Sequence, residues 1–164
     1  MFDLSILEKF DTQKMYAIYD RWPQIARESW EFIIEPVNFD NINHIIFAGM
    51  GGSGTIGDLF NAIFSKTNVH VTMIKGYLLP KTIDKNTLVV CTSISGNTIE
   101  TLSILEQIKN LDCEKLAISS GGKIEKFCNK NSIKYFKVTL FHSPRGSFTA
   151  FLYAILHILE SILP

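Results

Sequence analysis

The sequence is poor in cysteine and proline and has no excess of charge of either sign. Only three cysteines, Cys91, Cys113 and Cys128, occur among its 164 residues. An odd number of cysteines without paired spacing does not predict a disulfide framework, and with four scattered histidines they do not predict a zinc site either. We therefore expect a reduced, cytoplasmic protein that holds no metal.

The balance of charge and the hydropathy argue against two further kinds of partner. Sixteen lysines and arginines offset sixteen aspartates and glutamates, and the lysines form no dense block, so we expect no nucleic acid partner. The first residues, MFDLSILEKFD, carry acids and lack the basic start and long apolar core of a signal peptide. The apolar stretch near the C-terminus is too short to span a bilayer, so we expect no membrane partner.

Five short apolar runs rich in β-branched residues stand out from a composition that is 46% hydrophobic and 20% charged. They are nearly continuous rather than alternating, which is typical of strands covered on both faces of a parallel sheet. The predicted strands are His44–Ala48, Val69–Ile74, Thr87–Thr92, Lys115–Ser119 and Lys134–Val138.

Helical patterns lie between and around these strands. An amphipathic segment, Thr12–Ile34, precedes the first strand, and Pro23 either splits it or begins a new helix. The alternation predicts a single α/β domain over residues 1–164, a three-layer α-β-α sandwich with a five-stranded parallel sheet, on which a helical segment of residues 1–40 packs. The other predicted helices are Gly54–Ser65, Thr98–Lys109, Gly122–Asn131 and Phe148–Ile162.

The last predicted helix, Phe148–Ile162, is apolar almost all round. A helix of this kind needs cover on every side, and one small domain leaves a face over. We therefore expect a homodimer, or a contact with a second domain, through this helix. The alternative is complete burial within this domain.

Two loops follow predicted strands and precede predicted helices: GMGGSGTIGD, residues 49–58, and SISGNT, residues 93–98. In open α/β sheets, ligands bind at the carboxyl ends of the strands. Helix N-termini offer free N–H groups there, and small hydroxyl side chains donate hydrogen bonds to phosphate oxygens without adding bulk. The clustering of Ser93, Ser95 and Thr98 therefore predicts a phosphate site.

Two other interpretations of these loops exist. Asn97 and Thr98 are each a possible N-cap, and Asn97 with Glu100 matches a capping box. Ser53 is a possible cap of the first crossover helix, although one helix start needs only one cap. The glycine loop also spells G-x-G-x-x-G, the dinucleotide fingerprint. No acid follows at the end of the second strand, where Lys75 stands instead, so only a cofactor with a 2′-phosphate stays open as a weak alternative. We expect no cofactor.

The S-x-S-G-x-T pattern of residues 93–98 resembles the phosphate loop of the SIS (sugar isomerase) domain. In order along the chain, YDRWP, GMGGSGTIGD, TSISGNTIETL, SSGGKIEKFC and HSPRGSF are similar to the first half of archaeal-type bifunctional phosphoglucose/phosphomannose isomerases. The resemblance implies a flavodoxin-like topology and a hexose 6-phosphate as ligand.

The resemblance also implies roles for individual residues. The 6-phosphate would lie on the loop formed by Ser93, Ser95, Gly96 and Thr98. The sugar would lie beside Gly51, Gly52 and Ser53. Arg145 would stabilise negative charge on an enediolate at C1–C2, the alternative for this residue being a surface salt bridge.

Members of this family are about twice as long, and their second SIS domain supplies the glutamate base and an assisting histidine. We therefore expect this chain to be one part of an aldose–ketose isomerase that acts on glucose, mannose and fructose 6-phosphates. Nearby groups are poor substitutes for the base: Glu100 and Asp58 lie at a helix start, and His142 follows a strand exit. The alternative is a non-catalytic phosphosugar-binding or regulatory SIS module.

Overall fold

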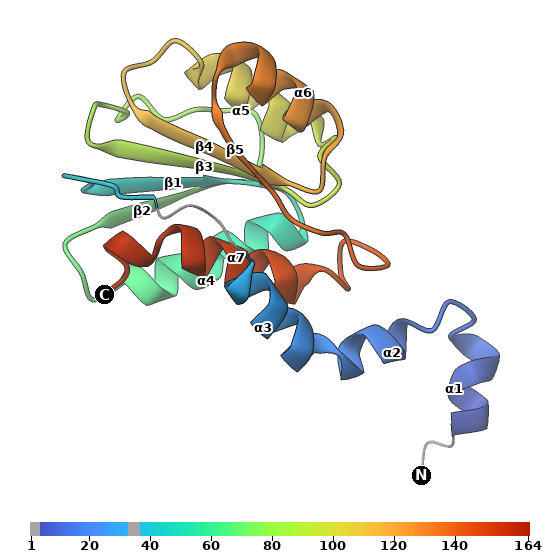
Figure 1. The fold of residues 1–164 in the computed structure, drawn as a ribbon. Coiled ribbons are helices and arrows are strands. Elements are labelled where there is room, and N and C mark those ends of the chain that lie inside the picture. Colours follow the sequence, from blue (N-terminus) through green and yellow to red (C-terminus); the bar gives the residue numbers. More distant parts are fainter. Residues whose placement is uncertain (1–3, 33–36) are drawn as a thin grey trace.

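The computed structural model describes residues 4–32 and 37–164. Five parallel strands form one sheet in the order β2-β1-β3-β4-β5, so the predicted parallel sheet and its flavodoxin-like order are confirmed (Figure 1). Each strand lies within one residue of its predicted bounds. The strands are β1 His44–Ala48, β2 His70–Ile74, β3 Thr87–Ser93, β4 Glu114–Ser119 and β5 Lys134–Lys137.

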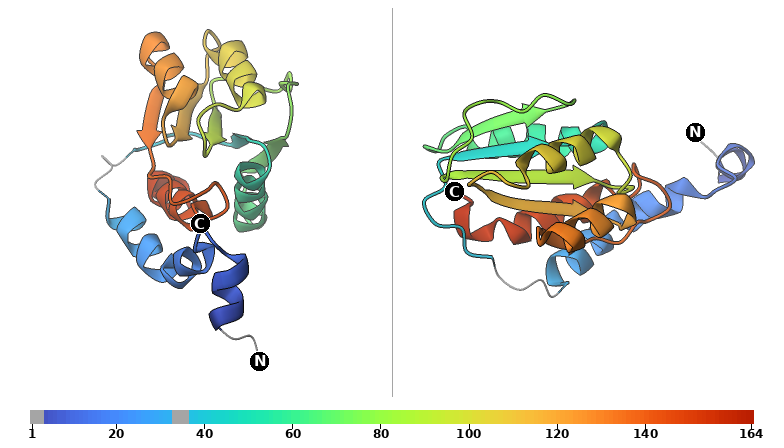
Figure 2. Two further views of the ribbon diagram at one scale, coloured as in Figure 1. Left: turned by 90° about the vertical axis from the view of Figure 1, so that its right-hand side faces the viewer. Right: turned by 90° about the horizontal axis from the view of Figure 1, so that it is seen from above.

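Two pairs of helices cover the two faces of the sheet, which confirms the three-layer sandwich (Figure 2). Helices α4 (Gly52–Phe64) and α7 (Phe148–Ile158) pack on the face formed by alternate residues such as Phe47 and Val90. Helices α5 (Ile99–Ile108) and α6 (Gly122–Asn131) cover the other face. The central strands β1 and β3 are buried along their whole length, as their continuous apolar runs predict.

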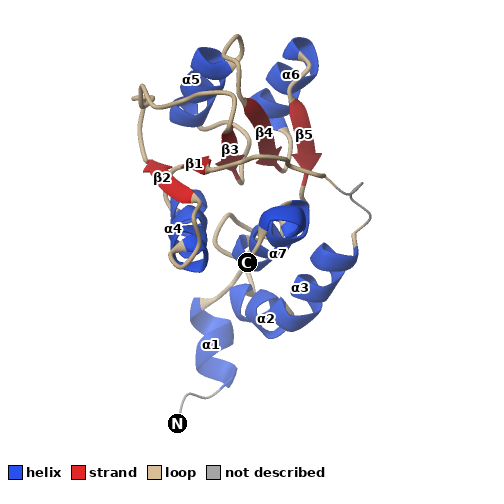
Figure 3. Ribbon diagram, turned by 90° about the vertical axis from the view of Figure 1, so that its left-hand side faces the viewer, coloured by secondary structure: helices blue, strands red, loops and turns tan. Residues whose placement is uncertain are grey.

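The N-terminal segment forms three short helices: α1 (Leu4–Phe10), α2 (Met15–Asp20) and α3 (Trp22–Glu31). Pro23 lies in the first turn of α3, where a missing N–H costs nothing, so it begins a new helix. Helix α1 lies within the predicted helical segment of residues 1–40 but before the amphipathic pattern Thr12–Ile34, and the end of that pattern at Ile34 lies outside the described residues. Figure 3 shows α3 and α2 beyond α7, on the side away from the sheet.

Helix α7 is shorter than predicted, because the chain turns at Leu159 into a 3₁₀ helix, Glu160–Ile162. The turn brings Ser161 to the segment that precedes β1. Its Oγ donates to the carbonyl of Val37 at 2.9 Å and accepts from the N–H of Phe39 at 3.3 Å. The sheet and α3 together bury most of the apolar surface of α7, although Tyr153 stays 37% exposed.

The three cysteines are free thiols. Cys91 and Cys128 are buried in the core between the sheet and α5–α6, and burial raises the pKa of Cys128 to about 11 and that of Cys91 as well. They therefore remain protonated and act as small apolar side chains. Within the described residues, no helix is both long enough and apolar enough to cross a membrane.

Candidate phosphosugar site

Three loops contact one another at the carboxyl edge of the sheet, where parallel strands all end. The loop after β3 contacts the loop after β1, because the N–H of Ile94 donates to Ser53 Oγ at 3.3 Å. It contacts the loop after β4 as well, because Ser120 Oγ donates to the carbonyl of Ile94 at 2.6 Å. Ile94 thus joins the glycine loop, the serine loop and the β4–α6 loop into one site.

The serine loop, residues 93–98, folds as a compact turn around its own hydroxyl groups. Ser93 is buried at the end of β3, and its Oγ lies 2.7 Å from Thr98 Oγ1 and accepts the N–H of Gly96 at 3.1 Å. Ser95 is exposed, and its Oγ accepts the N–H of Asn97 at 3.3 Å. The structure therefore brings together the predicted phosphate residues and leaves Ser95 open to solvent.

Gly96 is fixed by its contact with the β4–α6 loop. Its φ is +70°, and a Cβ at this position would lie 1.8 Å from the carbonyl oxygen of Gly121. The carbonyl of Gly96 accepts the N–H of Ile124 at 3.0 Å, in the first turn of α6. A residue without a side chain is required here for two reasons, its backbone conformation and the space available.

The capping interpretation is wrong for the side chains to which it was applied. Asn97 Oδ1 accepts the N–H of Lys123 at 3.2 Å, so Asn97 caps α6 and not its own helix. Thr98 is the N-cap residue of α5 but makes no capping hydrogen bond with its side chain. Ser53 lies inside α4, where its hydroxyl receives the Ile94 N–H instead.

The glycine loop leads directly into the N-terminus of α4. Gly51, with φ +55°, is the N-cap residue, and a Cβ on Gly51 or on Gly52 would meet no atom within 4 Å. Backbone at this helix start is therefore open to a ligand, next to the serine loop. Lys75, the residue that kept a dinucleotide cofactor open as an alternative, forms an ion pair with Asp58 at 2.7 Å.

Arg145 is exposed on the link between β5 and α7, residues 138–147. The side chain of Ser147 forms hydrogen bonds within this loop. Its Oγ accepts the N–H of Phe141 at 2.7 Å and donates to the carbonyl of Ser143 at 2.9 Å. Within the described residues, no carboxylate forms an ion pair with Arg145, so the surface salt-bridge alternative is not what the structure shows.

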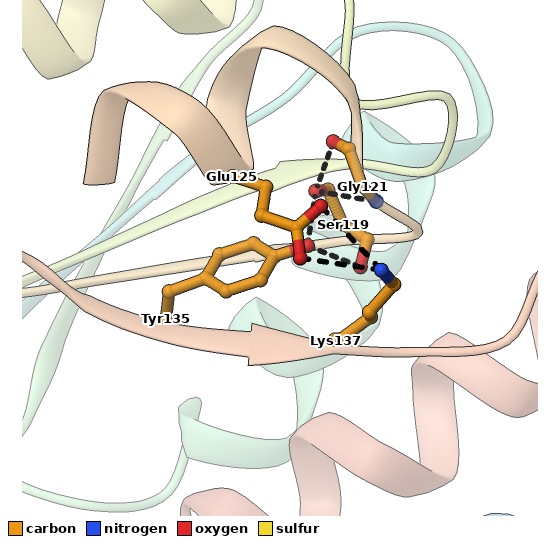
Figure 4. A network of polar contacts seen from close by, with 5 residues as sticks. All are labelled: Ser119, Gly121, Glu125, Tyr135 and Lys137. Carbon is orange, nitrogen blue, oxygen red and sulfur yellow. Dashed lines mark hydrogen bonds and ion pairs between the residues drawn. The ribbon is translucent and has the colours of Figure 1, made fainter. Parts of the chain in front are cut away.

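A polar network at the end of β4, which the sequence did not reveal, supports the serine loop from behind (Figure 4). The hydroxyl of the fully buried Ser119 donates to the Gly121 carbonyl at 2.8 Å and accepts the Gly121 N–H at 3.1 Å. Tyr135 on β5 donates to the Ser119 carbonyl at 3.2 Å, and burial raises the pKa of this phenol. The segment SSGGK, at the end of a strand and rich in small residues, was the available signal.

Beside this network, Lys137 Nζ lies 3.2 Å from Glu125 Oε1 and closes the outer side of the loop. A Cβ on Gly121 would lie 3.2 Å from Glu125 Oε2, so the carboxylate packs directly over this glycine. The β4–α6 loop is therefore held on both sides, and it holds Gly96 in turn.

The sequence model of the SIS domain matches residues 39–131, more than half of the chain. The chain belongs to the SIS domain family. The matched range contains all three loops of the site, and it ends before the loop that carries Arg145.

Relatives of this SIS domain include bifunctional phosphoglucose/phosphomannose isomerases. The protein of Caldicellulosiruptor bescii is 32% identical over 134 residues, which cover 80% of this chain. The protein of Aquifex aeolicus is 35% identical over 117 residues, which cover 70% of this chain. The matches span only 40% and 37% of the lengths of these relatives.

Solved structures show the same fold at low identity. The C-terminal domain of glucosamine-fructose-6-phosphate aminotransferase from Francisella tularensis has a TM-score of 0.62 at 16% identity, with 88% of this chain and 46% of that chain covered. The sugar isomerase domain of an RpiR transcription factor from Sphaerobacter thermophilus has a TM-score of 0.59 at 13% identity, with 93% and 92% covered. The same fold thus occurs in proteins of different kinds.

Proposed function

We propose that this SIS domain binds a hexose 6-phosphate at the carboxyl edge of its sheet and contributes that site to an aldose–ketose isomerase acting on glucose, mannose and fructose 6-phosphates. The observation that carries the proposal is the serine loop, where hydroxyl and N–H groups converge next to a helix N-terminus. The named relatives, which are phosphoglucose/phosphomannose isomerases, support this class of substrate.

In this proposal, the phosphate occupies the serine loop. The exposed Ser95 hydroxyl and the Ser93–Thr98 hydroxyl pair supply donors to its oxygens, because a hydroxyl hydrogen rotates to suit its acceptor. Gly96 keeps the backbone close enough for main-chain contact. The sugar then extends over the glycine loop, past Gly51, Gly52 and Ser53.

Arg145 is the proposed catalytic group of this chain. Its guanidinium would stabilise the negative charge of an enediolate, which forms when a base removes the proton next to the carbonyl carbon. Three acids or bases of this chain have other neighbours than a sugar. Asp58 pairs with Lys75, and the Nε2 atom of His142 lies 3.1 Å from the carbonyl of Gln13. Glu100 lies beside Tyr77, whose pKa is raised by burial and then by this carboxylate. We therefore assign the base to a second SIS domain.

The phosphate site is tested by titrating the chain with fructose 6-phosphate in a calorimeter. Ser95→Ala and Thr98→Val are each expected to weaken binding by about 1–3 kcal/mol, the range for a hydrogen bond to a charged group. Ser65→Ala, at the far end of α4, removes a hydroxyl that bonds the Ala62 carbonyl and should leave affinity unchanged. Unchanged affinity in both loop variants would falsify the phosphate assignment.

A non-catalytic phosphosugar-binding module is the second candidate, favoured by the engagement of Asp58 and His142. A coupled dehydrogenase assay separates the two. We expect no turnover from the chain alone and recovery of turnover when a second SIS domain from a relative is added. Turnover by the chain alone at an ordinary enzyme rate, on the order of 1–1000 per second, would show that the base lies in this chain. If no turnover is seen with the chain alone or after the second SIS domain is added, the binding module is favoured.

A further inference from the structure

The loop that carries Arg145 is fastened to the N-terminal helices by contacts distant in sequence. The indole Nε1 of Trp22 donates to the carbonyl of Gly146, the residue after Arg145, at 3.0 Å. At the other end of the loop, His142 Nε2 lies 3.1 Å from the carbonyl of Gln13. These contacts fix the orientation of the loop relative to the rest of the domain. The hydrogen bonds within the loop fix only its own shape.

Helix α2 packs against the same loop. A Cβ on Gly146 would lie 3.2 Å from Ile18 Cγ2 and 3.6 Å from Met15 Sδ, so the backbone of the loop rests directly on these side chains. The hydroxyl of Ser143 also lies 3.8 Å from Met15 Sδ. The loop therefore has no room to shift towards α2.

Trp22 is itself held in place. The rings of Tyr19 and Trp22 pack edge to face, with centroids 4.9 Å apart and planes at 89°. Trp22 is the first residue of α3, and Pro23 fixes the backbone φ immediately after it. The direction in which the indole N–H points is thus set by the helix start and by the Tyr19 ring.

We propose that Trp22 is a positioning residue for Arg145: through the Gly146 carbonyl it holds the loop so that the guanidinium meets the charged C1–C2 end of the ligand. A group held in its bound orientation loses less entropy on binding. This inference rests on the proposed function, because it takes Arg145 to face the sugar. It gives the Tyr19 and Trp22 side chains of the YDRWP motif a role at the site.

The test compares two ligands in calorimetric titrations of the chain. 6-Phosphogluconate carries a carboxylate at C1, opposite its phosphate, whereas inorganic phosphate engages the serine loop alone. Trp22→Phe, which keeps an aromatic ring but removes the N–H donor, should weaken 6-phosphogluconate about threefold to tenfold, the effect of one hydrogen bond. Its affinity for phosphate should not change. Trp30→Phe, the other tryptophan, which packs on His157, should leave both affinities as they are.

A double-mutant cycle separates positioning from a general structural effect. In an Arg145→Ala background, Trp22→Phe should cause no further loss of 6-phosphogluconate affinity. Should Trp22→Phe fail to fold, Gly146→Ala gives the same test from the loop side, since its Cβ would lie 2.8 Å from the Phe141 carbonyl oxygen and displace the loop.

Four results overturn the proposal. Three come from Trp22→Phe: full 6-phosphogluconate affinity, an equal loss of affinity for both ligands, or a loss that adds to that of Arg145→Ala in the cycle. Full affinity in Arg145→Ala also overturns it, while the phosphate site stands if Ser95→Ala still weakens both ligands. If neither Ser95→Ala nor Thr98→Val weakens phosphate binding, the proposed function fails independently of Trp22.

Discussion

Gly96 couples two loops of the site through the absence of a side chain. Its contact with the Gly121 carbonyl places the serine loop directly on the β4–α6 loop, and Asn97 adds a hydrogen bond to the backbone of Lys123. The phosphate site is therefore not a property of residues 93–98 alone. A change at Gly121 would reach the serine loop without touching any of its hydroxyls.

Gly96→Ala is expected to destabilise the fold by more than Gly51→Ala. Both positions have positive φ, which costs an alanine about 1–3 kcal/mol. Only at position 96 does the new Cβ also collide with a backbone atom, at 1.8 Å, whereas at Gly51 it meets nothing. Denaturant unfolding should therefore show a loss on the order of 3 kcal/mol or more for Gly96→Ala. Equal losses would show that the β4–α6 loop gives way.

The sequence predicted which side chains of the serine loop lie close together, but not all of the hydrogen bonds that they form. Ser93, Ser95 and Thr98 were predictable because they follow a strand within six residues. The role of Asn97 was not, since its partner Lys123 lies 26 residues later, on a loop that only the sheet order brings near. The mutual approach of Ser53 and Ile94 was hidden for the same reason.

Among the elements, β1 and β2 begin with a pair of histidines. His44 and His70 occupy the same register position, with ring centroids 5.1 Å apart, and His44 Nε2 lies 2.8 Å from Thr72 Oγ1. Burial lowers the pKa of His44 below its ordinary value of 6.5, and the charge of His70 lowers it further. The carbonyl of Thr82 and the carboxylate of Asp84 act in the opposite direction but do not outweigh them.

His44 binds its proton less readily in the folded state than in the unfolded state. The free energy of unfolding must therefore decrease as the pH falls below about 6.5. Thermal unfolding between pH 7.5 and 5.0 should show this fall in the unmodified chain. His44→Gln should reduce the slope, because glutamine keeps a polar partner for Thr72 without titrating. His70→Gln should reduce it less, since burial is the larger cause. An unchanged slope in His44→Gln would assign the acid sensitivity elsewhere.

The strands were predictable as elements, whereas the N-terminal helices were only partly so. Continuous apolar runs identify buried parallel strands whatever their neighbours are. Helix α1 has seven residues and no such pattern, and α2 begins where the N–H of Tyr16 donates to Asp11 at 2.8 Å, a local bond that overrides the continuous amphipathic pattern. The early end of α7 depends on Ser161 reaching Val37, which no local pattern contains.

Part of the apolar surface of α7 stays uncovered in the folded chain. Most of the helix is buried by the sheet and α3, which was the alternative to a partner, yet Tyr153 on α7 stays 37% exposed. Leu59 on α4, in the same layer, is 40% exposed. Self-association or pairing with a second SIS domain through this layer remains a prediction.

Tyr153→Asp is expected to shift the chain towards monomer in sedimentation velocity at high concentration, because it places a charge in the predicted contact. Leu111→Asp is the matched control: Leu111 is 39% exposed. It follows α5 in the sequence, and α5 covers the opposite face of the sheet (Figure 3). A chain that is monomeric without any substitution would leave pairing with a second domain as the only form of this prediction. An equal effect of both substitutions would contradict the assignment to α7.

The bond between Trp22 and Gly146 joins residues 124 positions apart, and this has a consequence during synthesis. At translation rates of 5–20 residues per second, α3 leaves the ribosome roughly 6–25 seconds before the loop and helix that cover it. During that interval Ile25, which is fully buried in the folded chain, has no final partner. The nascent polypeptide thus presents uncovered apolar side chains of α3, which is the kind of surface that chaperones bind.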